Sequence, residues 1–129
     1  MNNPREIIIA IDAMGGDYGP SSIIKGAFLA SKKMSKIKFI FFGKKEKITP
    51  LLEKNKILDI SEIVNTEQTI SNNTKPTDAL RKYRKSSMFR AIDSVKSRTS
   101  DAVVSSGNTG ALMVISTVLM KTIKGINRP

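Results

Sequence analysis

The chain has 129 residues and contains no cysteine, no histidine and no tryptophan. Without cysteine it has no disulfide, no thiolate nucleophile and no cysteine-ligated metal site. Without histidine it lacks the commonest general base and the commonest nitrogen ligand of zinc. Any chemistry must therefore use carboxylates, hydroxyls, ammonium and guanidinium groups and the backbone. We expect neither a metal nor a cofactor.

Long hydrophobic runs are also absent. The first apolar run, residues 7–11, is short and is followed by Asp12, so it does not have the pattern of a signal peptide. The most apolar stretch, residues 111–120, has about half the length needed to cross a bilayer. The sequence therefore predicts a soluble, cytoplasmic protein.

Positive charge is in excess, with a formal net charge of +11. Lysine outnumbers arginine, and the basic residues are scattered along the chain rather than gathered in one motif. Neither zinc-finger spacing nor aromatic residues interleaved with the basic ones appear, which argues against nucleic-acid binding. The charge fits better an anionic lipid surface or an acidic carrier protein.

Short apolar runs that alternate with helical patterns indicate the fold. The runs that predict strands are residues 7–11, 39–42, 63–64 and 102–104. Because several of them are apolar at every position, they are typical of parallel strands covered on both faces. Strands that alternate with helices predict an α/β fold, a doubly wound, Rossmann-like and mostly parallel sheet.

The helices between these strands have recognisable starts. Pro20 fits the first position of one helix, and Thr49 and Pro50 fit the N-cap and first turn of a second. Either Ser86 or Ser87 is expected to cap a third helix. Residues 111–123 predict a last helix that is apolar around most of its circumference and would need to be buried on several sides. Nothing after it could cover it, so the chain resembles a piece of a larger protein.

Two glycine-bearing turns, residues 12–19 and 105–110, directly follow predicted strands. Ligands of doubly wound sheets gather at the carboxyl ends of the strands, so the two turns could share one site. The second turn opens a helix and aims backbone N–H groups and the positive helix end at a small volume. The residues expected to bind a phosphate there are Ser105, Ser106, Gly107, Asn108, Thr109 and Gly110.

The spacing leaves an alternative open for this turn. It could be an ordinary strand-to-helix loop in which Asn108 or Thr109 only caps the helix. On spacing alone the two interpretations weigh equally.

Other candidates come from the first turn and from a helix. Gly15 and Gly16 are expected to let the first turn approach the same anion, and Arg81 offers a forked guanidinium for phosphate, although a surface helix arginine is the commoner case. A carboxylate near phosphate repels it unless it accepts hydrogen bonds, binds a cation or acts as a base. Asp17 is expected to fix its turn through side-chain-to-backbone bonds, whereas the role of Asp12 stays open.

Three motifs taken together carry a family resemblance: DAMGGD at residues 12–17, SSM at 86–88 and SSGNTGALM at 105–113. Their order and spacing resemble the bacterial phosphate acyltransferases of phospholipid synthesis (the PlsX family), and the resemblance runs from Ile7 to Pro129. Ser106 departs from the alanine usual in that family. Because family members are more than twice as long, residues 1–129 are expected to be the N-terminal part of a longer catalytic domain.

The resemblance implies a function and partners. Family members move a fatty acyl group from acyl carrier protein, an acidic protein, to inorganic phosphate, and they typically act as homodimers near the membrane. Such a reaction depends more on positioning and oxyanion donors than on a strong base, which suits a chain without histidine. Asn108 and Asp12 are the expected catalytic residues. The alternative is a truncated, inactive remnant that only binds an anion.

Overall fold

A computed structural model describes residues 5–128; Pro129, where the resemblance ends, lies outside the described residues. Four strands form one sheet: β1 (Ile7–Asp12), β2 (Ile37–Gly43), β3 (Ser61–Asn65) and β4 (Ala102–Val104). Their order is β3-β2-β1-β4, and all neighbours are parallel. The predicted α/β fold with a parallel, Rossmann-like sheet is confirmed.

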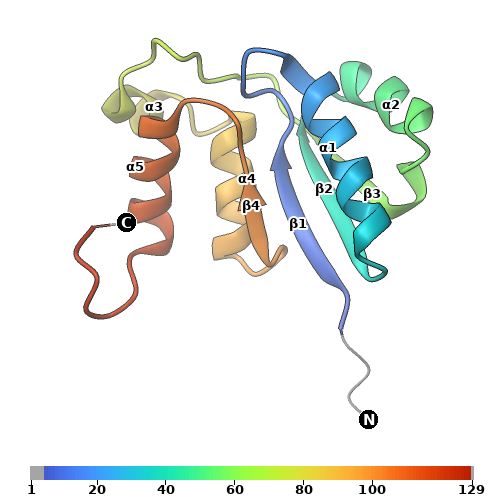
Figure 1. Cartoon of the computed structure of the whole chain (residues 1–129). Helices are drawn as coiled ribbons and strands as arrows, with labels where there is room; N and C mark the ends of the chain where they lie inside the picture. Colours follow the sequence, from blue (N-terminus) through green and yellow to red (C-terminus); the bar gives the residue numbers. More distant parts are fainter. Residues whose placement is uncertain (1–4, 129) are drawn as a thin grey trace.

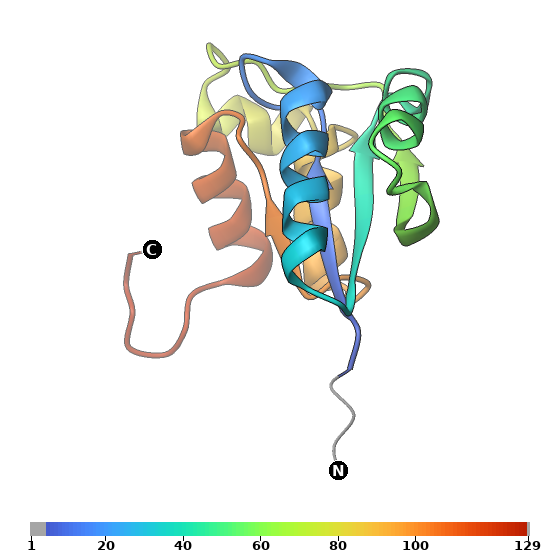
Figure 2. The same ribbon diagram turned by 45° about the vertical axis from the view of Figure 1, so that its right-hand side comes forward.

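Helices cover both faces of this sheet (Figures 1 and 2). Helices α1 (Gly19–Lys33) and α2 (Lys45–Lys54) lie on one face, with the short 3₁₀ turn η1 (Leu58–Ile60) leading into β3. Helix α4 (Ser87–Lys96) lies on the opposite face, and α3 (Pro76–Lys82) and α5 (Thr109–Met120) pack beside it. No helix within residues 5–128 is long and apolar enough to span a membrane.

Strand β2 shows why its apolar run folds as a doubly covered strand. Phe39 and Phe41 point into the core beneath α1 and α2, with their rings tilted and 5.8 Å apart, whereas Ile40 and Phe42 pack on the other face near α4. Successive side chains of a strand point to opposite faces, so an unbroken apolar run buries on both. All four side chains are at most 5% exposed.

The predicted start of the second helix is wrong. Helix α2 begins at Lys45, so Thr49 and Pro50 lie inside it. Burial of Ile48 and Leu52, four residues apart on one face, holds this longer helix together. Its first N–H group, on Lys45, donates to the Oδ1 of Asn65 at the end of β3 (3.0 Å). The cap comes from a residue 20 positions away, which no local pattern reveals.

The last helix is shorter than the apolar pattern predicts, because α5 ends at Met120 and Ile123 lies beyond it. Lys121 has a positive φ of 63°, which is not helical and ends α5, and its N–H still donates to the Thr117 carbonyl (3.0 Å). Within α5 Ala111 and Ile115 are buried, whereas Met113 and Val118 are about half exposed.

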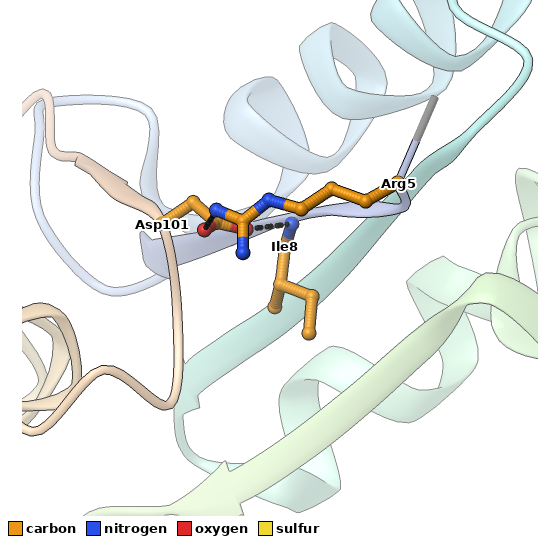
Figure 3. Close-up of polar contacts among 3 residues, drawn as sticks. All are labelled: Arg5, Ile8 and Asp101. Carbon is orange, nitrogen blue, oxygen red and sulfur yellow. Dashed lines mark hydrogen bonds and ion pairs between the residues drawn. The ribbon is translucent and has the colours of Figure 1, made fainter. Parts of the chain in front are cut away.

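At the amino ends of the strands, Asp101 joins the start of β4 to the start of β1 (Figure 3). One carboxylate oxygen pairs with the Arg5 guanidinium, and the other accepts from the Ile8 N–H (2.9 Å). The Asp101 N–H donates to the Ile8 carbonyl (2.8 Å). These bonds fix β4, which has only three residues, against β1 and so position the turn that follows β4.

Candidate functional site at the carboxyl edge of the sheet

The carboxylate of Asp12, at the end of β1, is 1% exposed and accepts four hydrogen bonds. Its Oδ1 accepts from the Ser87 hydroxyl (2.6 Å) and from the N–H groups of Met14 and Gly15 (both 3.2 Å). Its Oδ2 accepts from the Ser105 hydroxyl (2.8 Å). Of the roles left open by the sequence, the structure therefore places Asp12 as a hydrogen-bond acceptor that joins β1, α4 and the turn after β4.

The two glycine turns meet directly above this carboxylate. A Cβ atom on Gly15 would lie 2.6 Å from the Asp12 Oδ2 and 2.9 Å from the Cα of Gly107, so the site has room only for glycine. Gly16 has a φ of +95°, and the Ser106 hydroxyl donates to the Gly15 carbonyl (3.3 Å). The structure thus brings together the two turns that the sequence analysis placed in one site.

Asn108 caps α5, as the simpler of the two interpretations predicts. Its Oδ1 accepts from the Ala111 N–H (3.0 Å). Its Nδ2 group donates to the carbonyls of Ser71 (3.0 Å) and Thr74 (2.9 Å), with a longer contact to Asn72 (3.4 Å). Both ends of the amide are therefore engaged in holding residues 71–74 against the start of α5.

Asp17 does not fix its own turn as expected. Its carboxylate accepts instead from the side-chain amide of Asn72 (3.1 Å). The reason is that Asn108 holds residues 71–74 beside the first turn, which puts Asn72 within reach of Asp17. Three segments far apart in the sequence, residues 12–18, 71–74 and 105–110, are therefore cross-linked by polar side chains.

Free hydrogen-bond donors remain at the start of α5. The Thr109 and Gly110 N–H groups occupy the first two helical positions, where no carbonyl of the helix can reach them. The Thr109 side chain is exposed, and its hydroxyl has no partner within residues 5–128. The Ser105 hydroxyl, in contrast, donates to Asp12 and accepts from the Gly107 N–H (3.1 Å).

Helices α1, α4 and α5 all begin at this edge of the sheet (Figure 1). Each helix start carries about half a unit of positive charge. Ser86 caps α4 by accepting from the Phe89 N–H (3.2 Å), which selects it over Ser87 as the cap, whereas α1 has no side-chain cap. The arrangement favours a small anion near the start of α5.

The structure does not bring Arg81 into this cluster. It is exposed on α3 and makes no hydrogen bond or ion pair within residues 5–128. The sequence analysis in turn missed Ser87 as a site residue. The available signal was the serine pair: because one serine suffices to cap α4, the other is free to bind elsewhere. Among the described residues, no three carboxylates lie together as metal ligands would.

The fold and the site define an α/β protein in which a glycine-bearing turn and the start of α5 lie at the carboxyl edge of a parallel sheet. Comparison with known families identifies the family to which this α/β protein belongs. The match to the family described as "Fatty acid synthesis protein" covers residues 7–129, so the chain belongs to that family.

Individual relatives share a name. The phosphate acyltransferase of Parvibaculum lavamentivorans is 46% identical over 127 residues, which are 97% of this chain and 35% of that protein. The phosphate acyltransferase of Ehrlichia ruminantium is 45% identical over 127 residues, 95% of this chain and 37% of that protein. The chain therefore spans about a third of the length of the curated relatives it matches, and it matches their N-terminal part.

Proposed function

We propose that the chain provides the phosphate-binding part of an enzyme that transfers a fatty acyl group from acyl carrier protein to inorganic phosphate. The observation that carries the proposal is the start of α5, where the Thr109 and Gly110 N–H groups and the Thr109 hydroxyl have no partner within residues 5–128 and lie beside the contact between the two glycine turns. The names of the relatives, phosphate acyltransferases, support acyl transfer to phosphate.

In this reaction a phosphate oxygen attacks the thioester carbonyl carbon. The carbonyl oxygen becomes an oxyanion, the C–S bond then breaks, and the carrier leaves as a thiolate while acyl phosphate forms. Phosphate is already anionic near neutral pH and a thiolate leaves readily, so no strong base is required. Loss of one oxyanion donor typically raises the barrier by about 2.7–4 kcal/mol, so the geometry of the turns can supply much of the catalysis.

Each site residue has a separate role in this proposal. Thr109 and Gly110 bind phosphate, and Gly15, Gly16 and Gly107 let the turns approach it. The remaining residues act by position: Asp12 through its four hydrogen bonds, Ser105 and Ser106 through their bonds to the first turn, and Asn108 as cap and clamp. Arg81 takes part only if it moves from its exposed position on α3 toward the phosphate.

A threonine pair on one helix tests phosphate binding. Thr109→Val removes the unpaired hydroxyl at the start of α5, whereas Thr117→Val removes a hydroxyl that donates to the Met113 carbonyl (2.7 Å) in the same helix. Titration with inorganic phosphate should shift the Thr109 and Gly110 amide resonances, and Thr109→Val should weaken binding by about ten- to a hundredfold, since a hydrogen bond to a charged group contributes about 1.5–3 kcal/mol. Equal binding by both variants would refute the site.

Turnover is tested separately, with acylated carrier protein and phosphate as substrates and the acyl phosphate trapped by hydroxylamine. Product formation that Asn108→Ala abolishes supports the proposed reaction. If a full-length protein that contains this chain forms no acyl phosphate, with or without this substitution, the proposed reaction is wrong.

A second candidate is an anion-binding unit without turnover. The apolar side chains exposed on and after α5, Met113, Val118 and Ile123, favour it, because surfaces of this kind usually contact another part of a protein. It predicts phosphate binding together with binding of a hydrophobic dye. Measurable turnover by a monodisperse sample would exclude it.

The family resemblance adds three further expectations to the proposal: a homodimer, a cytoplasmic location and peripheral contact with the membrane. Sedimentation and vesicle flotation test the first and the last of them.

A further inference from the structure

Four exposed basic side chains lie in the last turn of α3 and in the segment that leads from it to α4, shortly before the serine that bonds to Asp12. They are Arg81, Lys82, Arg84 and Lys85, called here the basic turn. Lys85 is two residues from Ser87, whose hydroxyl donates to the Asp12 carboxylate. The backbone N–H of Lys85 is held by the side chain of Gln68 (3.1 Å). The basic turn therefore lies at the rim of the candidate site.

The charge of the basic turn is largely uncompensated. Residues 81–85 contain four cations and no acid. Lys82 pairs with Asp78 (3.4 Å), but within residues 5–128 neither arginine of the turn, nor Lys85, has an ion-pair partner. The turn can therefore attract a negatively charged partner.

Helix stability explains only two of the four charges of the basic turn. Arg81 and Lys82 lie in the last turn of α3, where cations favour the helix. Arg84 and Lys85 lie beyond α3 and just before the start of α4, where the positive helix end disfavours cations. The helix ends therefore give no reason for these two charges, which leaves them available to a partner.

The surroundings of the basic turn indicate the class of that partner. The large hydrophobic side chains exposed in the described structure all lie outside residues 75–90, so the turn has no apolar anchor for insertion into a lipid surface. Its one aromatic residue, Tyr83, packs against the cluster formed by α3, α4 and α5, so no exposed ring is available for stacking on bases. The forked guanidinium groups pair with carboxylates as well as with phosphates, and the partner in the proposed function is an acidic protein.

We propose that the basic turn is the docking surface for an acidic carrier protein that delivers its thioester to the adjacent glycine turns. This inference rests on the proposed function. Contacts between complementary charges at a rim mainly speed association and depend strongly on salt. Arg84 and Lys85, which helix stability does not explain, should contribute most.

The test compares two double charge reversals. Arg84→Glu/Lys85→Glu alters the basic turn, and Lys33→Glu/Lys96→Glu makes the same change in net charge at the last turns of α1 and α4, at the opposite edge of the sheet. Binding of purified acylated carrier protein is measured by calorimetry at low and at physiological salt. The first variant should bind about tenfold more weakly, with a smaller salt dependence, whereas the control should bind within about twofold of the wild type.

Two further measurements separate docking from other causes. The unfolding midpoint of Arg84→Glu/Lys85→Glu should be no lower than that of the wild type, because acidic residues are favoured before a helix start. Phosphate titration should still shift the Thr109 and Gly110 amide resonances.

Several outcomes would overturn the proposal. Equal losses in both double variants would indicate a general charge effect. Selective loss of binding to anionic vesicles or to RNA, with carrier binding unchanged, would assign the turn to another partner. If the wild type forms acyl phosphate and the first variant binds carrier normally, the docking surface alone is wrong. Carrier binding through the turn supports docking even if a full-length protein that contains this chain forms no acyl phosphate, in which case only the proposed reaction fails.

Discussion

The hydroxyl of Ser87 donates a 2.6 Å hydrogen bond to the Oδ1 of Asp12, which joins the start of α4 to the end of β1. The two residues are 75 positions apart in the sequence and both are 1% exposed. The bond places a carboxylate beneath the contact between the two glycine turns. Because both of its oxygens accept hydrogen bonds, Asp12 is better suited to hold the turns than to remove a proton.

The role of Asp12 predicts different effects for two substitutions. Asp12→Ala leaves two backbone N–H groups and two hydroxyls without their acceptor and should lower the free energy of unfolding by about 3 kcal/mol. Asp12→Asn keeps an acceptor in place and should cost about 1 kcal/mol. Urea denaturation measures both values. Because Asp12→Asn removes a negative charge near the anion, it should bind phosphate at least as tightly as the wild type; loss of phosphate binding would contradict the positioning role.

The adjacent serines should separate helix capping from this role. Ser86→Ala removes the cap of α4 and should cost about 1 kcal/mol of unfolding free energy. Ser87→Ala removes a donor to Asp12 at a similar cost of about 1 kcal/mol. Only Ser87→Ala should shift the amide resonance of Gly15, which shares the Asp12 Oδ1. An equal Gly15 shift in both variants would show that the two serines act only through α4.

Local patterns predicted most of the fold. The run that contains Phe39 and Phe41 is short, aromatic and apolar at every position, which favours a strand covered on both faces. The start of α2 could not be predicted in this way. Thr49 and Pro50 form a plausible start, but burial of Ile48 and capping by Asn65 move the start to Lys45.

The candidate site was also predictable only in part, because contacts between distant segments, which local patterns do not reveal, set some of its bonds. The meeting of the two glycine turns follows from strand order, since carboxyl ends of parallel strands share one edge. The partners of Asp12 and Asn108 do not follow, because Ser87 and residues 71–74 reach them through tertiary packing. Ser105 and Asn108 have the right residue types to bind phosphate, yet both use their side chains within the protein.

Asn108 combines two roles that a pair of substitutions can separate. Asn108→Ala removes both the cap of α5 and the bonds to residues 71–74, and it should cost about 1–2 kcal/mol. Asn108→Asp keeps the capping oxygen but turns the other oxygen toward the Ser71 and Thr74 carbonyls, which repel it. Hydrogen exchange should therefore rise in residues 71–74 in both variants, and in the first turn of α5 only in Asn108→Ala. If residues 71–74 exchange no faster in Asn108→Asp than in the wild type, the bonds from Asn108 to this segment do not hold it in place.

The contact between the glycine turns predicts that Gly15 cannot carry a side chain. The Cβ of Gly15→Ala would lie 2.6 Å from the Asp12 Oδ2, and because buried backbone and carboxylate atoms cannot easily move, the turns must separate. We expect a loss of about 2 kcal/mol in the free energy of unfolding and weaker phosphate binding. Gly26→Ala is the matched control, because its Cβ would meet no atom within 4 Å on the exposed side of α1, and it should stabilise the protein by about 1 kcal/mol. Calorimetric melting and phosphate titration of both variants check this, and a Gly15→Ala protein as stable as the wild type would mean that the two turns are not in contact.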